Sequence, residues 1–324
     1  MTRRRALAAG LLLLLACAPG CGLKSGSPLV DDVRPGTLGK GLPLKGASLT
    51  VTSKSFSEQI ILGSMIGLIF KAAGAEVLDR TNIQGSIGAR EAIKSGAADA
   101  MYEYTGTAWI TYLGNDEPIT DPVEQWRAVR DADLRNGITW LRPSTLDNTY
   151  ALAVSREKNR PYGLRTLSDV AALSRRDPAA VTLCVENEFA SRDDGLPGME
   201  KAYGMDLPSS AIRKMDTGII YTQIAKPGSC LLGEVYTTDG RIASLDLQVM
   251  EDDKHFFPNY DAAPVVNSEV LERWPAIRGL LDPLSAKLTT DVGRELNAKV
   301  DVEGEDPHEV AKEWLVEEGF VTAG

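Results

Sequence analysis

The feature that most constrains the fold is an alternation of strand-like and helix-like segments that begins near residue 48. A β-rich run at 49–52 is followed by a helical pattern over 55–73 that ends at a glycine. The pattern continues with a strand candidate at 75–78, a helix candidate at 87–94 and a strand candidate at 98–104. This β-α-β-α-β rhythm predicts a parallel sheet covered by helices on both faces.

A second unit with a similar rhythm runs from about residue 150 to residue 251. Its expected strands are 150–154, 181–185 and 231–236, and its expected helices are 167–173 and 218–225. After the second unit, helical patterns return at 268–274, 277–286 and 307–318. The periodicity therefore predicts a two-domain α/β protein. Ligands of open α/β sheets bind beyond the carboxyl ends of the strands, so residues at those ends are candidates for a site.

The N-terminal 45 residues predict export. Three arginines at 3–5 precede an apolar stretch that is shorter than the roughly 20 residues needed to cross a bilayer, so 1–16 is expected to be a signal peptide. Leu-Leu-Ala-Cys at 14–17 resembles a lipobox, which makes Cys17 the expected lipidation site and Cys21 the alternative. A lipoprotein would be extracytoplasmic, anchored to the outer face of the cytoplasmic membrane. The other possibility is an ordinary cleaved signal on a freely secreted protein.

Residues 17–45 are rich in Gly, Pro, Ser and Lys and are expected to form a flexible tether. The formal net charge is −10. This acidity argues against nucleic acid or anionic lipid as a partner. Beyond the first 16 residues no long apolar run occurs, so we expect contact with the membrane only through the lipid anchor.

Two cysteines remain in the folded part of the chain, Cys184 and Cys230. In an oxidising compartment such a pair is expected to form a disulfide, and the spacing fits no zinc pattern. The two histidines, His255 and His308, lie in no metal-binding or triad motif. Nucleophile-elbow, P-loop and dinucleotide-binding motifs are also missing from the sequence. We expect no metal, no cofactor and no enzyme activity.

Six short motifs carry a resemblance to a known family. They are SKSFSEQ at 53–59, YEYTGT at 102–107, NTYALAV at 148–154, EFASRDDG at 188–195, YTTDGRI at 236–242, and EDDK with FFPNY across 251–260. In this order, the chain resembles the glycine betaine/choline/carnitine-binding proteins of ABC importers. The resemblance covers nearly the whole mature chain.

The resemblance implies a type II periplasmic-binding-protein fold. Such a fold has two α/β lobes joined by two crossing segments, with the ligand cleft between them. Lobe one is expected to comprise 46–149 and 252–324, and lobe two 150–251. The protein is expected to be a monomer that works with the permease and ATPase subunits of an importer.

In this family a box of tyrosines holds the trimethylammonium head of the ligand, and by motif position these are Tyr104, Tyr150, Tyr236 and Tyr260. A quaternary ammonium has no N–H group, so hydrogen bonds cannot recognise it. Aromatic faces attract it through the ring quadrupole and match its apolar surface, at about 0.5–2 kcal/mol per ring. The alternative for each tyrosine is an ordinary packing role.

The resemblance also implies polar contacts to the ligand. Arg192 matches the position that binds the ligand carboxylate, a role that suits a permanently charged bidentate donor. Lys54 and Thr107 match secondary polar positions at the same end, and Gln59 and Asn148 are weaker candidates. The alternative for Arg192 is an ion pair with the neighbouring acidic turn at 193–195. We expect that turn, and the one at 252–253, to be solvated and not to bind calcium.

These expectations define three candidate functions. The first is a receptor that delivers a quaternary-ammonium osmolyte, such as glycine betaine, to an ABC importer. The second is a binding module used for sensing and not for import. The third, a secreted hydrolase acting on a choline ester, is disfavoured because the sequence carries no nucleophile motif.

Overall fold

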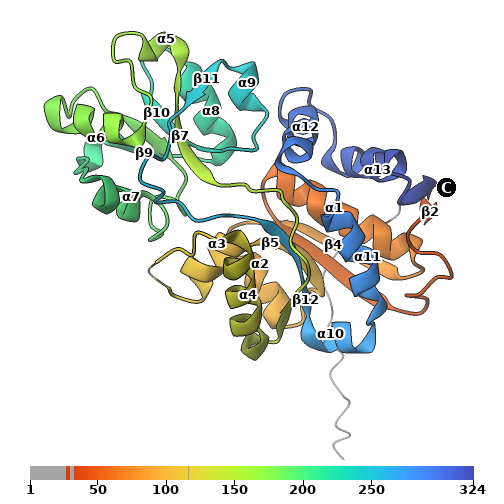
Figure 1. Ribbon diagram of the computed structural model, residues 1–324. Coiled ribbons are helices and arrows are strands. Elements are labelled where there is room, and N and C mark those ends of the chain that lie inside the picture. Colours follow the sequence, from red (N-terminus) through yellow and green to blue (C-terminus); the bar gives the residue numbers. More distant parts are fainter. Residues whose placement is uncertain (1–26, 30–32, 116) are drawn as a thin grey trace, which may run out of the picture.

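The computed structural model describes residues 27–29, 33–115 and 117–324. They form two α/β lobes, each built around its own sheet (Figure 1). The chain crosses between the lobes twice, through residues 141–149 and 250–261. The expected signal peptide and both candidate lipidation cysteines, Cys17 and Cys21, lie outside the described residues.

Lobe one contains a six-stranded sheet. In spatial order its strands are β1 (Ser27–Pro28), β4 (Glu76–Ile83), β3 (Ser48–Lys54), β5 (Ala100–Tyr104), β12 (Ala262–Asn267) and β6 (Ile138–Trp140). The central strand β3 runs parallel to β4 and β5. The outer pairings, β1 with β4 and β12 with β5 and β6, are antiparallel.

Lobe two contains a five-stranded sheet. Its spatial order is β11 (Leu247–Val249), β7 (Tyr150–Ser155), β10 (Leu232–Tyr236), β8 (Leu183–Val185) and β9 (Ile212–Lys214). Strand β8 is parallel to both of its neighbours, β10 and β9. Strand β7 is antiparallel to both β10 and β11.

Both sheets are therefore mixed, and the expectation of a purely parallel sheet is wrong. The reason lies in the two crossings between lobes. Strand β12 enters lobe one at the edge where β5 ends, since Ala262 pairs with Tyr104. Strand β7 enters lobe two at the edge where β10 ends, since Tyr150 pairs with Tyr236. A strand that enters at the edge where its neighbour ends must run against it, and local periodicity carries no information about such long-range connections.

The helices surround the two sheets. In and around lobe one they are α1 (Ser57–Ala72), α2 (Ser86–Lys94), α3 (Thr105–Thr107) with a π-helical turn (Ala108–Tyr112), α4 (Pro122–Asp133), α10 (Ser268–Arg273), α11 (Ala276–Ser285), α12 (Thr290–Asp301) and α13 (Pro307–Glu317). In lobe two they are α5 (Arg156–Asn159), α6 (Leu167–Arg176), α7 (Leu196–Tyr203), α8 (Thr217–Ala225) and α9 (Arg241–Ser244).

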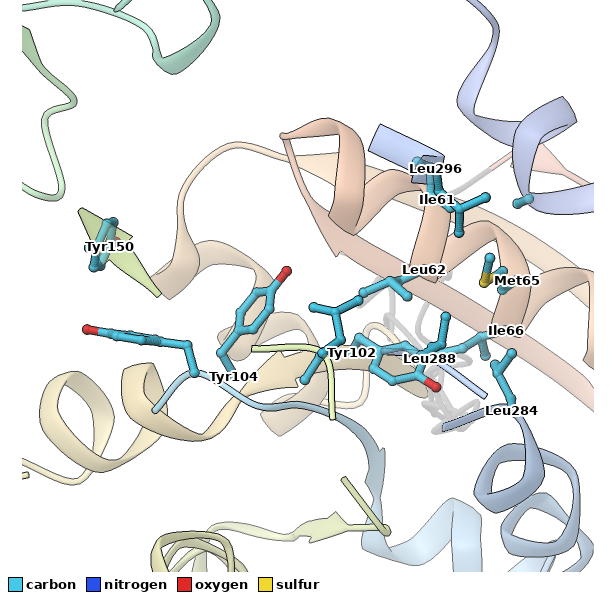
Figure 2. Packing of buried hydrophobic residues seen from close by; sticks show 14 of the residues in the cluster. Ile61, Leu62, Met65, Ile66, Tyr102, Tyr104, Tyr150, Leu284, Leu288 and Leu296 are labelled. Atoms are coloured by element: carbon cyan, nitrogen blue, oxygen red, sulfur yellow. The ribbon is translucent and has the colours of Figure 1, made fainter. Parts of the chain in front are cut away.

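Helix α1 forms the centre of lobe one, and most of its residues are buried. One side packs on β3 and β4, and the other side packs on α11, α12 and α13. Figure 2 shows Leu62, Met65 and Ile66 of this helix against Tyr102 of β5 and Leu284 of α11. A helix that is apolar on every side is a core helix, and this one holds its N-terminal turn rigidly beside the space between the lobes.

The segment before residue 46 differs from the expected tether. Strand β2 (Val33–Pro35) pairs with β13 (Val321–Ala323), next to the C-terminus. Leu44 is fully buried and Leu38 is nearly so. Residues 33–45 are therefore packed onto lobe one, and the expectation of a flexible tether over this stretch is wrong. Composition concealed the packing, because only a few buried apolar residues hold the segment.

The expected disulfide between Cys184 and Cys230 is present, with the two Cα atoms 5.7 Å apart. It joins β8 to the residues that lead into β10. Within the described part of the chain, no helix is both long enough and apolar enough to cross a membrane.

Candidate ligand-binding site

A cavity of about 380 Å³ lies between the lobes and is lined by residues of both. Eight of the nine expected ligand contacts line it: Lys54, Tyr104, Thr107, Asn148, Tyr150, Arg192, Tyr236 and Tyr260. These residues come from segments far apart in the sequence. The fold therefore brings together the tyrosines and polar residues that the motifs singled out.

The tyrosines reach the cavity because they sit where strands begin or end. Tyr104 is the last residue of β5 and Tyr236 the last of β10, whereas Tyr150 is the first residue of β7. Tyr260 lies two residues before β12. Gly106 gives its ring room, because a β-carbon at position 106 would lie 2.9 Å from ring atoms of Tyr260.

Five aromatic rings form a continuous group that we call the ring cluster: Phe56, Tyr104, Tyr150, Tyr236 and Tyr260. The ring of Tyr150 lies 5.3 Å from that of Tyr236 and 5.3 Å, edge to face, from that of Tyr260. Phe56 stacks on Tyr236 at 5.3 Å and on Tyr104 at 6.2 Å. The cluster thus joins rings of both lobes around one side of the cavity.

Sequence reasoning did not assign Phe56 to the site, although it lies within the first motif, at 53–59. It precedes the first residue of α1 and lines the cavity. One signal was available in the sequence. Phe56 is an aromatic residue at the start of a predicted core helix, where it could face a ligand site. Phe56 adds a ring without a hydroxyl group, and hence a purely apolar face.

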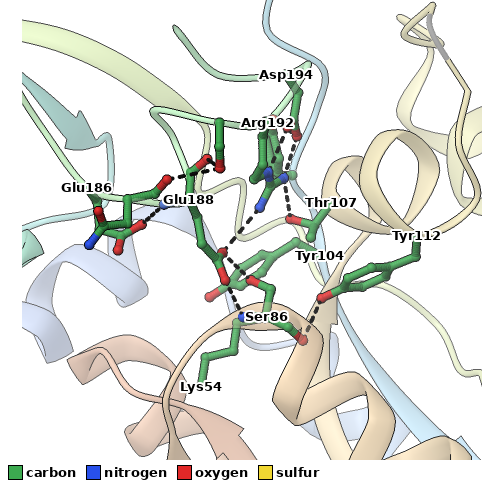
Figure 3. Close-up of polar contacts among 12 residues, drawn as sticks. Lys54, Ser86, Tyr104, Thr107, Tyr112, Glu186, Glu188, Arg192 and Asp194 are labelled. Atoms are coloured by element: carbon green, nitrogen blue, oxygen red, sulfur yellow. Dashed lines mark hydrogen bonds and ion pairs between the residues drawn. The ribbon is translucent and has the colours of Figure 1, made fainter. Parts of the chain in front are cut away.

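Arg192 is buried and forms a two-point ion pair with Asp194 (Figure 3). Its Nε donates to Oδ1 of Asp194 at 2.7 Å, and its Nη2 donates to Oδ2. Nη2 also lies 3.4 Å from Oγ1 of Thr107, across the cleft. Nη1 lies 3.7 Å from the Glu188 carboxylate. The guanidinium thus has protein partners on several sides.

The expectation that the 193–195 turn is solvated is wrong for Asp194, which is 3% exposed. Besides pairing with Arg192, Asp194 accepts a 2.7 Å hydrogen bond from the hydroxyl of Tyr260. This one carboxylate therefore connects the arginine to the ring cluster. The next residue, Gly195, lies close to the backbone of Phe189, because a β-carbon at position 195 would lie 2.2 Å from the carbonyl oxygen of Phe189.

Glu188 links the two lobes directly. Its carboxylate accepts hydrogen bonds from the backbone N–H of Ser86 at 2.6 Å and from the hydroxyl of Ser86 at 2.8 Å (Figure 3). Ser86 begins α2 in lobe one, where unpaired N–H groups favour a negative charge. We call Ser86, Thr107, Glu188, Arg192 and Asp194 the Arg192 cluster.

Lys54 also has a protein partner. Its Nζ lies 2.5 Å from Oε1 of Glu103 and 4.9 Å from the centre of the Tyr104 ring. Gln59 is buried and accepts a 3.3 Å hydrogen bond from the backbone N–H of Lys54. Gln59 is not among the residues that line the cavity. Its contact is with the backbone of a lining residue, so the expectation of a direct ligand contact receives no support from the structure.

The lining carries an excess of acidic groups. Six carboxylate side chains line the cavity, against three basic ones. Among the residues that the structure describes, no group of His, Cys, Asp and Glu could hold a metal ion. An acidic cavity with one aromatic side is suited to a cation whose charge is spread over apolar groups.

Comparisons with known proteins agree with this geometry. A family model described as the substrate binding domain of ABC-type glycine betaine transport system matches residues 47–317. A glycine-betaine-binding protein of Pseudomonas aeruginosa is 37% identical over 282 residues, which is 86% of this chain and 90% of the relative. The ergothioneine transport permease/ergothioneine binding protein EgtU of Helicobacter pylori is 32% identical over 82% of this chain and 47% of its own length.

A solved structure has the same fold. The crystal structure of a glycine betaine/carnitine/choline ABC transporter protein aligns with a TM-score of 0.67 and 29% identity, over 84% of this chain and 99% of that one. The chain belongs to the family of substrate-binding domains of ABC-type glycine betaine transport systems. Members of this family are extracytoplasmic receptors for small quaternary-ammonium ligands, and they work with permease and ATPase subunits.

Proposed function

We propose that the protein binds glycine betaine or a closely related quaternary-ammonium osmolyte and delivers it to an ABC importer. The observation that carries this proposal is the ring cluster, in which aromatic faces from both lobes meet at an acidic cavity. A trimethylammonium head offers no hydrogen bonds, and ring faces are the groups that recognise such a head.

The proposed contacts fall into two sets. Tyr104, Tyr150, Tyr236 and Tyr260 would hold the cationic head, with Phe56 as a fifth ring. Rings that contribute about 0.5–2 kcal/mol each fall short of the −8.2 kcal/mol of a micromolar complex once the costs of association are counted. Polar contacts from Arg192, Thr107 and Asn148 would supply the remainder. In this proposal Lys54 makes a further polar contact with the ligand, next to the Tyr104 ring.

Ligand contacts on both lobes suggest how binding reaches the permease. A ligand held by Tyr104 of lobe one and Tyr236 of lobe two favours the arrangement in which the lobes are close together. That arrangement is the form expected to dock on the permease. Lipidation at Cys17, or alternatively at Cys21, would keep the receptor at the outer face of the cytoplasmic membrane.

Calorimetric titration of the purified protein tests the proposal. The panel is glycine betaine, proline betaine, carnitine, choline and ectoine, together with ergothioneine because the Helicobacter pylori relative is named for it. We expect at least one trimethylammonium ligand to bind with a Kd in the micromolar range or below. Absence of binding by every quaternary ammonium compound in the panel would refute the proposal.

A further inference from the structure

Glu58 is a buried carboxylate that lies at the wall of the cavity and belongs to neither set of ligand contacts above. It is in the first turn of α1, and it is 4% exposed. Its Oε1 accepts hydrogen bonds from the hydroxyl of Tyr104 at 2.6 Å and from Nδ2 of Asn148 at 2.9 Å. Its Oε2 accepts from Oγ1 of Thr238 at 2.7 Å and from Nδ2 of Asn297 at 2.9 Å. Each carboxylate oxygen of Glu58 thus accepts two hydrogen bonds.

These four donors come from four parts of the fold. Tyr104 ends β5 and Asn148 lies in the first crossing segment. Thr238 follows β10 of lobe two, and Asn297 lies in α12. A single carboxylate therefore holds a ring of the ring cluster, a segment that joins the lobes, and a turn of lobe two.

All four partners are neutral, whereas three other buried carboxylates in this part of the molecule have a basic partner. Glu103 is paired with Lys54, Asp194 with Arg192, and Asp239 with Arg241. Within the described ranges, no basic side chain forms an ion pair with Glu58. The negative charge is hydrogen-bonded but not neutralised.

The hydrogen-bond pattern suits the ionised form. A carboxylate has about four acceptor positions, and the four donors around Glu58 occupy all of them. Burial raises the pKa of Glu58, and the hydrogen bonds from its four partners oppose that rise. An ionised carboxylate without a protein cation attracts a cation into the adjacent cavity.

We propose that Glu58 supplies the counter-charge of the cavity and orients Tyr104, so that the site selects a cationic head over a neutral head of the same shape. This inference rests on the proposed function and identifies a positioning and specificity residue for it. The hydroxyl of Tyr104 donates to the carboxylate, which increases electron density in the ring that faces the cation. Ring faces alone attract apolar groups of any charge, whereas a fixed negative charge behind them discriminates by charge.

The substitution Glu58→Gln isolates the charge. The side chain keeps its length and shape, and the hydroxyl of Tyr104 can accept as well as donate. The Oδ1 atom of Asn148 is buried and has no partner among the described residues. Turning this amide would therefore satisfy a glutamine Nε2. A purely structural role of Glu58 would be largely preserved in this variant.

The ligand pair is glycine betaine and 3,3-dimethylbutanoate, in which carbon replaces the quaternary nitrogen and the shape is unchanged. We expect Glu58→Gln to weaken glycine betaine on the order of tenfold to fiftyfold. We expect the affinity for 3,3-dimethylbutanoate to stay the same or to increase. The readout is the Kd of 3,3-dimethylbutanoate divided by the Kd of glycine betaine, which should fall in Glu58→Gln. Loss of the fold or of the ring geometry would instead weaken the binding of both ligands together.

Two controls complete the test. Asp216→Asn removes another carboxylate that lines the cavity but is exposed to solvent, so it should change the ratio less than threefold. Tyr104→Phe keeps the charge of Glu58 and removes its hydrogen bond to the ring. It should reduce the preference for glycine betaine over 3,3-dimethylbutanoate about threefold, and this can be measured even if Glu58→Gln does not fold.

Equal losses for both ligands, or no loss for glycine betaine, in Glu58→Gln would overturn the inference. If Glu58→Gln does not fold, an unchanged ratio in Tyr104→Phe would overturn it. If the wild type binds no quaternary ammonium compound at all, the proposed function itself fails.

Discussion

The ring cluster and the Arg192 cluster border the same cavity and draw on the same two lobes, but they are prepared for a ligand in opposite ways. The ring cluster presents apolar faces that pack on one another and need no polar partner. In the Arg192 cluster Asp194, Glu188 and Thr107 all contact the guanidinium. A ligand carboxylate would have to compete with Glu188 for Nη1 of Arg192.

The comparison shows where affinity and where selectivity are expected to arise. Contacts with the rings are expected to cost little reorganisation, because the rings pack on one another. Exchange of partners at Arg192 breaks existing interactions, so the net gain from the carboxylate contact is smaller than the contact itself. The rings would then set most of the affinity, and the Arg192 cluster would discriminate among zwitterions.

The largest effect is expected from Arg192→Ala, because it leaves Asp194 buried without its cation. Breaking a buried ion pair by removing one partner lowers the free energy of unfolding by about 3–5 kcal/mol. Chemical denaturation of the variant and the wild type measures this. The double variant Arg192→Met with Asp194→Leu should recover most of the loss. A single-variant loss below about 1 kcal/mol would mean that the arginine is held for the ligand and not for the fold.

The next effect concerns the disulfide, which connects the two clusters through lobe two. Cys184 lies in β8, which leads to Glu188 and Arg192, and Cys230 precedes β10, which ends at Tyr236. Replacing both cysteines by Ala should lower the free energy of unfolding by roughly 3–4 kcal/mol, since the bond closes a loop with a sequence separation of 46. Mass spectrometry of the non-reduced wild-type protein should find no free thiol at Cys184 or Cys230. Two free thiols in protein from an oxidising compartment would contradict this expectation.

A smaller effect is expected from Tyr236→Leu, which keeps apolar bulk and removes the ring. Affinity for a trimethylammonium ligand should fall by about 1–2 kcal/mol, near tenfold, while the protein stays folded. Tyr236→Phe is the matched control and should lose less, because the ring face remains. Titration calorimetry of both variants and the wild type with glycine betaine measures these losses of affinity. Unchanged affinity in Tyr236→Leu would shift the source of affinity away from the ring cluster.

Per pH unit, the smallest effect is expected in the pH dependence of stability, and it comes from a buried carboxylate next to Glu186, a residue that lines the cavity. Glu234 in β10 is buried, which raises its pKa to about 8, while its carboxylate accepts a hydrogen bond from the backbone N–H of Glu186. The folded pKa is above the unfolded value of about 4.3. The folded state therefore binds more protons at Glu234 between those values, so the contribution of Glu234 to stability is most favourable below about pH 4 and declines as pH rises to 8.

Denaturation between pH 5 and 8 should show this decline, with a contribution of about 1 kcal/mol per pH unit from Glu234. Asp261, whose pKa burial raises to about 7, adds to the same trend at the lower end of the range. Glu234→Gln removes its share and should flatten the profile. A profile that rises between pH 5 and 8 in the wild type would contradict the assignment.

Sequence reasoning predicted the ring cluster better than the Arg192 cluster, for a physical reason. Tyr104, Tyr150 and Tyr236 lie at the ends of regular strands, so local pattern and motif position were enough to place them at a sheet edge. The partners of Arg192 depend on how the chain turns at Asp194 and on what the other lobe presents. Glu58 escaped attention because a glutamate in the first turn of a helix is ordinary, and only the packed structure shows that four neutral donors surround it.

The sequence by itself determined the α/β alternation, the core helix α1, the cysteine pair and the aromatic residues available to a ligand. Each of these depends on local periodicity or on residue chemistry, which a single chain displays directly. The tertiary structure alone decided the mixed strand directions, the packing of residues 33–45 onto lobe one, and the hydrogen bonds between Glu188 and Ser86 across the cleft. Those features depend on contacts between residues tens to hundreds of positions apart, and such contacts exist only after the lobes have folded and met.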